Sequence, residues 1–226
     1  MDDTLTNRRI IHPEPPMTQE FEDADAGRVT QAIQHIQNKN FTQAEALLLD
    51  VCSRCPDEYR YEYIEGDTRF IKFWDQQEFI EYVATQPKDR LEKIVWIQSV
   101  YPRACYYLAY VLVEKNDYRG AVRWLTKGQA MEPSNPNFLL ELGVAYGYLM
   151  QYQKSLECYQ QALHLPGLSK HDRAVALRGT GVQLIDLQRL DEAKAHLNES
   201  LELEPDNPIA RDELIYIARL RSGRRI

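Results

Sequence analysis

Apolar and polar positions alternate along most of the chain with the period of an α-helix. Between residues 102 and 207, apolar residues recur at positions i, i+3, i+4 and i+7 in short segments that a few polar residues separate. The pattern predicts three pairs of helices. One such pair is too small to bury its apolar face alone, so we expect neighbouring pairs to stack on one another.

The three pairs repeat at a nearly constant spacing. Leu108 and Leu142 are 34 residues apart, as are Tyr118 and Tyr152. The third pair follows at 38 residues, where Leu190 stands in the place of Tyr152, and the additional residues fit a longer loop. A constant period near 34 residues indicates an array of helix-turn-helix units.

Each pair combines small and large residues, and a proline follows the second helix of the first and third pairs, at Pro133 and Pro205. This pattern resembles the tetratricopeptide repeat (TPR) family, and the resemblance covers residues 102–207 as three repeats. Residues 25–58 resemble a fourth, degenerate repeat, in which Gln31 stands where regular repeats have leucine. The resemblance implies a mainly α fold, an α-solenoid of stacked helical hairpins.

Residues 59–101 interrupt the helical period. The stretch "YRYEYIEGDTRFIKFW", which starts at residue 59, alternates with period two on both sides of Gly66 and Asp67. This pattern predicts a β-hairpin in which Tyr63 pairs with Phe70, because glycine readily adopts the positive φ that a two-residue turn needs.

A helix is predicted to follow the hairpin, beginning at Asp75. Residues 94–98 are rich in β-branched and aromatic side chains, which favours a third strand, with a helix as the alternative. We therefore expect a small β-containing insert of the ββαβ type, or else a hairpin with helices.

The predicted hairpin has an aromatic face that needs a cover, because an isolated hairpin is only marginally stable in water. We expect this face to pack against the helix at Asp75 or against the tyrosines of 106–110, whereas the opposite face carries Ile71 and Phe73. The aromatic face is also a candidate contact surface for a partner. Its predicted functional residues are Tyr61, Tyr63, Phe70 and Trp74.

Charge is concentrated at the two ends of the chain. Residues 1–24 are predicted to form an acidic, proline-containing tail, and residues 208–226 a C-terminal capping helix with a basic tail. The remaining body is mildly acidic, which disfavours nucleic-acid binding because phosphate contacts need clustered cations. The sequence has neither an apolar run of the ~20 residues that span a bilayer nor the apolar core of a secretory signal. We therefore expect a cytoplasmic protein without membrane insertion.

The sequence contains no motif typical of a catalytic or metal site. Its five histidines lack metal-binding spacing. The pair Cys52 and Cys55 falls at the end of a helical segment before Pro56, where the helix dipole opposes a thiolate, so we expect reduced, structural thiols. We predict no cofactor, no metal and no enzymatic activity.

TPR arrays bind other proteins as a family, and the resemblance implies that the first helix of each repeat lines a groove for a partner helix or peptide. A subclass binds acidic chaperone tails through a Lys/Asn clamp, but Tyr106 and Tyr110 stand at those positions here. Arg103 and Arg178 remain as cations, so we expect an aromatic, apolar groove with cationic edges. The implied groove residues are Arg103, Tyr106, Tyr110, Glu114, Asn137, Leu140, Val144, Tyr148, Arg178, Val182 and Ile185, with Val113, Gly147, Val175 and Asp186 beside them.

The sequence favours a non-enzymatic protein–protein interaction module, that is an adaptor, a scaffold or a chaperone-like protein, with a groove that the insert shapes. The alternatives are an immunity or antitoxin protein that neutralises a toxin, and a structural module that assembles into a homo-oligomer. The identity of the partner stays open. So does the state of the groove, which is either free or filled by the insert or the N-terminal tail.

Overall fold

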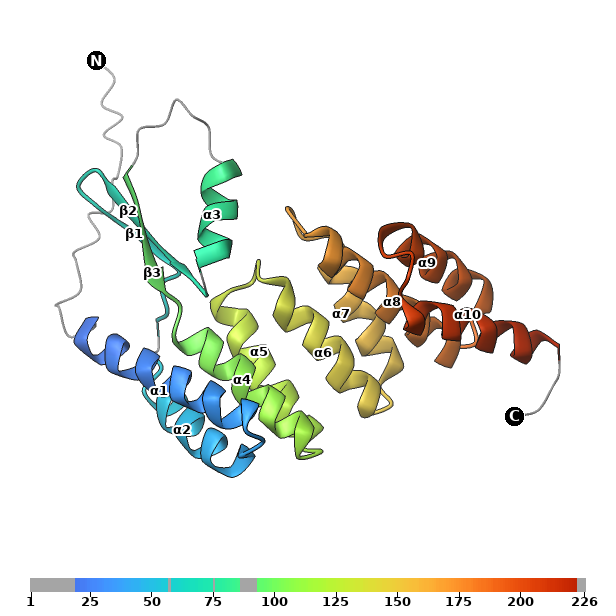
Figure 1. Ribbon diagram of the computed structural model, residues 1–226, viewed down its shortest axis with the longest axis horizontal. Coiled ribbons are helices and arrows are strands. Elements are labelled where there is room, and N and C mark those ends of the chain that lie inside the picture. The colour runs from blue at the N-terminus through green and yellow to red at the C-terminus, as the bar shows by residue number, and fades with distance from the viewer. Residues whose placement is uncertain (1–18, 57, 75, 86–92, 223–226) are drawn as a thin grey trace, which may run out of the picture.

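The computed structural model describes residues 19–56, 58–74, 76–85 and 93–222. These residues form a mainly helical array with a small three-stranded sheet inserted near its N-terminal end (Figure 1). The predicted fold class is therefore confirmed. In chain order the elements are α1 (Gln19–Gln37), α2 (Phe41–Ser53), β1 (Glu62–Glu65), β2 (Thr68–Phe73), α3 (Gln76–Thr85), β3 (Lys93–Gln98), α4 (Tyr101–Glu114), α5 (Tyr118–Met131), α6 (Pro136–Tyr148), α7 (Tyr152–Leu163), α8 (Lys170–Asp186), α9 (Leu190–Leu203) and α10 (Pro208–Arg221).

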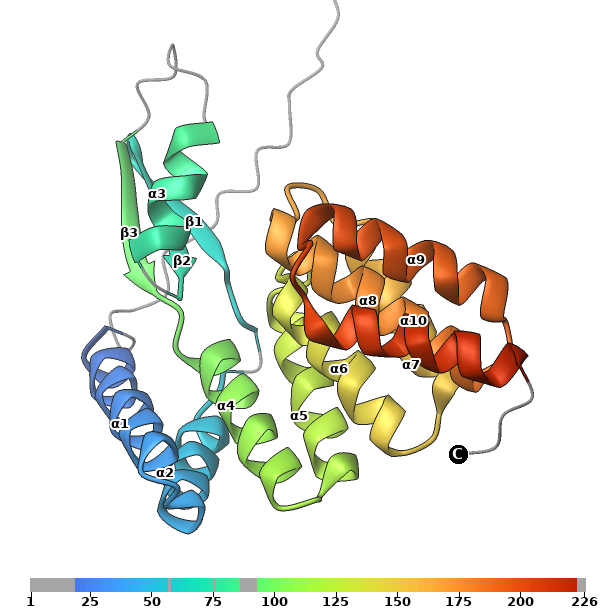
Figure 2. The same ribbon diagram turned by 45° about the vertical axis from the view of Figure 1, so that its right-hand side comes forward.

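The helices pair as α1–α2, α4–α5, α6–α7 and α8–α9, and α10 packs on α8 and α9 (Figure 2). The same turn joins the two helices of every pair. One residue adopts a positive φ, and the next N–H bonds back to a carbonyl five residues earlier, as from Asp117 to Leu112 at 2.8 Å. The positive-φ residues are Lys39, Asn116, Met150 and Gln188, and the last three are spaced by the same 34 and 38 residues as the repeats.

Small residues at the helix crossings are required by the packing. A Cβ atom on Gly143 would lie 2.5 Å from the ring of Tyr159, which is almost fully buried. A Cβ atom on Gly181 would lie 2.6 Å from the side chain of Leu197. Because these contacts are far below van der Waals distance, a larger residue would push the two helices of the hairpin apart.

The first hairpin differs from the others at the position that the sequence marked as degenerate. Gln31 is exposed, whereas Leu108, its counterpart in α4, is fully buried. Helix α1 lies at the end of the array (Figure 2), so it needs fewer apolar contacts than the helices inside. α1 begins at Gln19, so the last part of the stretch assigned to the tail is helical, and residues 1–18 lie outside the described chain.

The insert is a ββαβ element, which resolves the alternative at residues 94–98 in favour of a strand. β2 lies between β1, to which it runs antiparallel, and β3, to which it runs parallel. The predicted register is confirmed, since Tyr63 pairs with Phe70 and their rings stack with centroids 4.9 Å apart. Gly66 has a φ of +56° in the turn, as the sequence required.

Of the two covers expected for the aromatic face, Tyr106 is observed, with its ring 5.0 Å from that of Trp74, whereas α3 is not. α3 packs on the opposite face, where the ring of Phe79 lies 5.7 Å from that of Phe73 and 6.2 Å from that of Trp96. Ile71, on this same face, is fully buried. Alternation along a strand predicts which residues share a face, but the covering helix is chosen by tertiary contacts. The predicted helix start, Asp75, lies outside the described residues.

Phe138 of α6 is a central residue of the main core. Its side chain is fully buried, and its ring contacts those of Trp74 and Tyr106 at centroid distances of 5.7 and 6.1 Å. It also fills the space beside Gly128, where a Cβ atom would lie 2.2 Å away. Phe138 thus joins the insert, α4, α5 and α6 in one cluster.

We expect Phe138→Ala to lower the free energy of unfolding by about 3–5 kcal/mol, because the truncation leaves a cavity where four elements meet. Urea denaturation followed by circular dichroism measures the change. Ile209→Ala in α10, where the side chain is 55% exposed, is the control and should change stability by no more than about 0.5 kcal/mol. Equal effects of the two substitutions would contradict a central role for Phe138.

Candidate functional site

Three apolar side chains stand exposed on the first helices of neighbouring repeats. Tyr110 of α4 is 41% exposed, and Val144 and Tyr148 of α6 are 36% and 59% exposed. Tyr148 stacks on Tyr118 with centroids 4.6 Å apart, which limits the motion of its ring. We call the surface that carries Tyr110, Val144 and Tyr148 the first-helix face.

The other residues predicted to bind a partner are distributed between this face and the core. Glu114 and Asp186 are exposed, whereas Leu140 and Ile185 are buried and belong to the core clusters. Burial of Leu140 and Ile185 removes them from direct contact with a partner. The half-buried members of the set are Arg103, Tyr106, Val113, Asn137, Gly147, Val175, Arg178 and Val182.

The two candidate cations are engaged within the protein. The guanidinium of Arg103 lies 5.8 Å from the ring centroid of Tyr107. Nη1 of Arg178 donates to the carboxylate of Glu204 at 2.6 Å, and the Arg178 side chain is only 12% exposed. Of the two cations expected at the edge, Arg178 is therefore neutralised by a carboxylate of the chain itself, whereas Arg103 keeps its charge.

The insert packs against one part of the first-helix region and leaves the rest exposed. The ring of Tyr106 lies 5.0 Å from that of Trp74, and its hydroxyl donates to Glu141 at 3.5 Å. Tyr110, one helical turn further along α4, stays exposed. Among the described residues, the insert thus covers the position of Tyr106 and not that of Tyr110.

The insert residues predicted to be functional also differ in exposure: one is buried, two are half-buried and one is exposed. Trp74 is buried at 8% exposure and serves as a core residue. Tyr63 and Phe70 are half-buried on the face opposite α3. Tyr61 is 38% exposed at the beginning of the hairpin, where its ring lies 6.4 Å from that of Phe73.

A buried carboxylate connects the insert to the repeats, and the sequence analysis missed it. Glu132, at the end of α5, accepts hydrogen bonds from Ser99 Oγ at 2.5 Å and from Trp74 Nε1 at 2.7 Å. It also accepts from Asn135 Nδ2 at 3.1 Å, and the hydroxyl of Tyr59 lies 3.1 Å from Ser99 Oγ. Side chains from both ends of the insert therefore converge on one carboxylate.

Burial of the Glu132 carboxylate is electrostatically unfavourable. Burial raises the pKa of Glu132, and the hydrogen bonds from Ser99, Asn135 and Trp74 act in the other direction without cancelling the increase. On its other side, the insert is held by Lys72 of β2, whose Nζ lies 2.9 Å from the Glu22 carboxylate of α1. The insert is thus held by a polar contact on each side.

A repeated sequence motif could have revealed Glu132. The stretches "EPSNP" at 132–136 and "EPDNP" at 204–208 form equivalent turns. In each, the asparagine side chain caps the next helix and donates to the glutamate, as Asn207 does to Glu204 at 3.2 Å. The remaining partners differ, because Glu132 binds the insert whereas Glu204 binds Arg178 and His171.

The cysteines have structural surroundings. Cys52 Sγ lies 3.8 Å from Cys105 Sγ in the core, whereas Cys55 Sγ lies 3.5 Å from Met131 Sδ. The two thiols of the CxxC pair therefore have different neighbours. The hydrogen bond with Cys52, together with burial, raises the pKa of the Cys105 thiol and disfavours a reactive thiolate.

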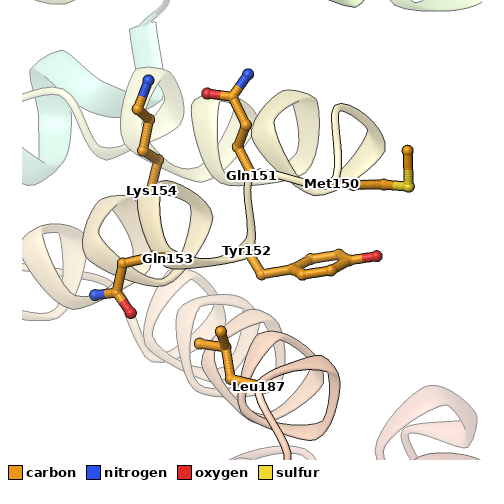
Figure 3. A pocket seen from close by; sticks show the side chains of 6 residues that line it. All are labelled: Met150, Gln151, Tyr152, Gln153, Lys154 and Leu187. Carbon is orange, nitrogen blue, oxygen red and sulfur yellow. The ribbon is translucent and has the colours of Figure 1, made fainter.

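Other possible sites are poorly developed. No cluster of three or more metal-binding side chains exists among the residues that the structure describes. A depression of about 360 Å³ lies at the turn from α6 to α7, lined by Met150, Gln151, Tyr152, Gln153, Lys154 and Leu187 (Figure 3). Lys154 and Tyr152 are the ionisable side chains of this lining, and no carboxylate or histidine accompanies them there. Within the described chain, the helices are too short or too polar to cross a membrane.

Sequence and structure comparisons identify the family. The sequence model described as "Tetratricopeptide repeat" matches residues 184–207. The chain contains a tetratricopeptide repeat and has the fold of a TPR array. No curated protein matches its sequence.

Solved structures with the TPR fold resemble much of the chain. The first TPR domain of Spaghetti (RPAP3), solved with the HSP90 peptide SRMEEVD, is 26% identical with a TM-score of 0.50, over 54% of this chain and 93% of that one. PilF of Pseudomonas aeruginosa is 14% identical with a TM-score of 0.63, over 91% and 72% of the two chains. A TPR protein from Parabacteroides merdae is 13% identical with a TM-score of 0.59, over 89% and 61%. The last two likenesses concern the fold alone.

We expect Glu132→Ala to loosen the insert, because Trp74 Nε1 and Ser99 Oγ lose their buried acceptor. The cost should be on the order of 3 kcal/mol. Hydrogen exchange measured by mass spectrometry should show faster exchange in β2 and β3. Glu204→Ala, at the equivalent turn, is the matched control and should accelerate exchange in α8 and α10 while β2 and β3 stay protected.

Proposed function

We propose that this TPR protein is a non-enzymatic protein-interaction module that binds a helix or short peptide of a partner along its first-helix face. The observation that carries the proposal is the exposure of Tyr110, Val144 and Tyr148 on adjacent repeats. Tyrosine is enriched at energetically important positions of interfaces, because its ring offers a large contact area and its hydroxyl a hydrogen bond. An adaptor, scaffold or chaperone-like role is consistent with such a surface.

The comparison with a peptide-bound domain supports a peptide as the occupant. The RPAP3 domain that resembles this chain was solved with a short HSP90 peptide. TPR proteins in general are interaction modules without catalytic function. We therefore propose that the repeats of this chain present their first helices to a partner segment in the same general way.

The insert gives this TPR protein its particular shape, and we propose that it bounds the binding surface. Its Trp74 covers Tyr106 in the first half of α4, so a partner segment would lie along the exposed positions beyond it. The Glu132 contact fixes the insert in this place. The insert and the repeats would then together determine where a partner segment can lie on the first-helix face.

Selection from a displayed library of random 20-residue peptides tests the proposal. Peptides enriched on the wild-type chain should bind the Tyr110→Ala/Tyr148→Ala variant at least about tenfold more weakly, because two exposed aromatic anchors are lost. Fluorescence anisotropy measures the affinities. The control variant is Leu49→Ala/Ile209→Ala, which removes exposed apolar side chains from α2 and α10. If the enriched peptides bind both variants equally well, the first-helix face is not the binding surface.

A further inference from the structure

Carboxylates without an ion-paired cation among the described residues occur on α4, α6, α8 and α10. Glu114, Asp186 and Asp212 are exposed, and Glu141 and Glu213 are half-buried. None of these five forms an ion pair with another residue in the part of the chain that the structure describes. They therefore contribute uncompensated negative charge.

These acids form two groups on either side of the apolar residues. Near α4 and α6, Glu114 and Glu141 both act on the hydroxyl of Tyr110, whose pKa is raised by burial first and by these carboxylates second. At the other end, burial raises the pKa of Glu213, and the charges of Asp186 and Asp212 raise it further. Val144, Tyr148 and Val182 belong to the helices between the two groups.

The cations of the first helices are either engaged elsewhere or, like Lys170 and Arg173, lie in the first turn of α8, more than three turns before Asp186. Arg103 lies over Tyr107, and Arg178 is paired with Glu204. Lys115, at the end of α4, is paired with Glu45 of α2. Arg219 lies in the last turn of α10, beyond Asp212 and Glu213. Among the described residues, the carboxylates next to Tyr110 and those shared between α8 and α10 therefore have no ion-paired cation.

We propose that the partner segment of this TPR protein is a cationic peptide or helix, in which lysine or arginine residues flank apolar side chains. The inference rests on the proposed function and specifies its ligand. The apolar side chains of the segment would contact Tyr110, Val144 and Tyr148, while its cations reach the two groups of carboxylates. A cation would also relieve the mutual repulsion of Asp186, Asp212 and Glu213. An acidic segment would be repelled and would find both candidate arginines already engaged.

The peptides enriched from the same random library test the charge of the segment. On the wild-type chain, they should contain more Lys and Arg than Asp and Glu, together with apolar residues. A representative enriched peptide should bind the Glu114→Lys/Asp186→Lys/Asp212→Lys variant at least about tenfold more weakly, since three favourable charge contacts become repulsive. Its affinity for the wild-type chain should fall as salt is raised from 50 to 300 mM.

A matched variant separates a local effect from one of net charge. Glu157→Lys/Glu199→Lys/Glu202→Lys alters the total charge by the same amount, but on the second helices α7 and α9. The representative peptide should bind this control variant within about threefold of the wild-type affinity. Equal weakening in both triple variants would overturn the inference.

Two further outcomes distinguish this inference from the proposed function. Neutral or acidic enriched peptides that still lose affinity with Tyr110→Ala/Tyr148→Ala would overturn the cationic partner and leave the binding surface in place. Enriched peptides that are insensitive to the tyrosine variant would overturn both. If sedimentation shows self-association that the triple first-helix variant abolishes, the occupant is a second copy of the chain, and the cationic partner segment is refuted.

Discussion

The buried carboxylate of Glu132 is the contact on which the arrangement of insert and repeats depends. A buried charge is costly unless donors surround it, and here two of the donors come from the insert, Trp74 Nε1 and Ser99 Oγ. Satisfying the carboxylate therefore requires the insert to dock at the turn between α5 and α6. Docking places Trp74 against Phe138 and Tyr106. The hydrogen bonds to Glu132 and the apolar packing of Trp74 therefore favour the same position of the insert.

This docking decides which part of the first helices stays accessible. The position of Tyr106 is covered from the insert side, whereas Tyr110, Val144 and Tyr148 remain exposed on successive repeats. The stacking of hairpins adds a second constraint. Gly143 and Gly181 bring the two helices of their hairpins close together, and Gly179 of α8 allows close packing against Tyr159 of the preceding hairpin. A surface made of repeated positions suits an extended or helical segment better than a compact small molecule.

Charge distinguishes this surface from a clamp for acidic tails. Arg178 is held by Glu204 in a turn equivalent to the one that holds Glu132, so the same local motif serves two purposes. In one repeat the glutamate binds the insert, and in the other it neutralises a cation of the first helix. Glu114 and Asp186 have no ion-paired cation among the described residues.

Local sequence determined much of this protein. The 34-residue period, the positive-φ turns at Asn116 and Met150 and the register of Tyr63 with Phe70 all depend on residues close together in the chain. Only the tertiary structure decided which face of the hairpin α3 covers, because alternation defines two faces and leaves the choice between them open. It also decided the partners of Glu132 and Arg178, since Trp74 lies 58 residues before Glu132, and Glu204 lies 26 residues after Arg178. Such contacts depend on how separate elements dock, and periodicity describes only one element at a time.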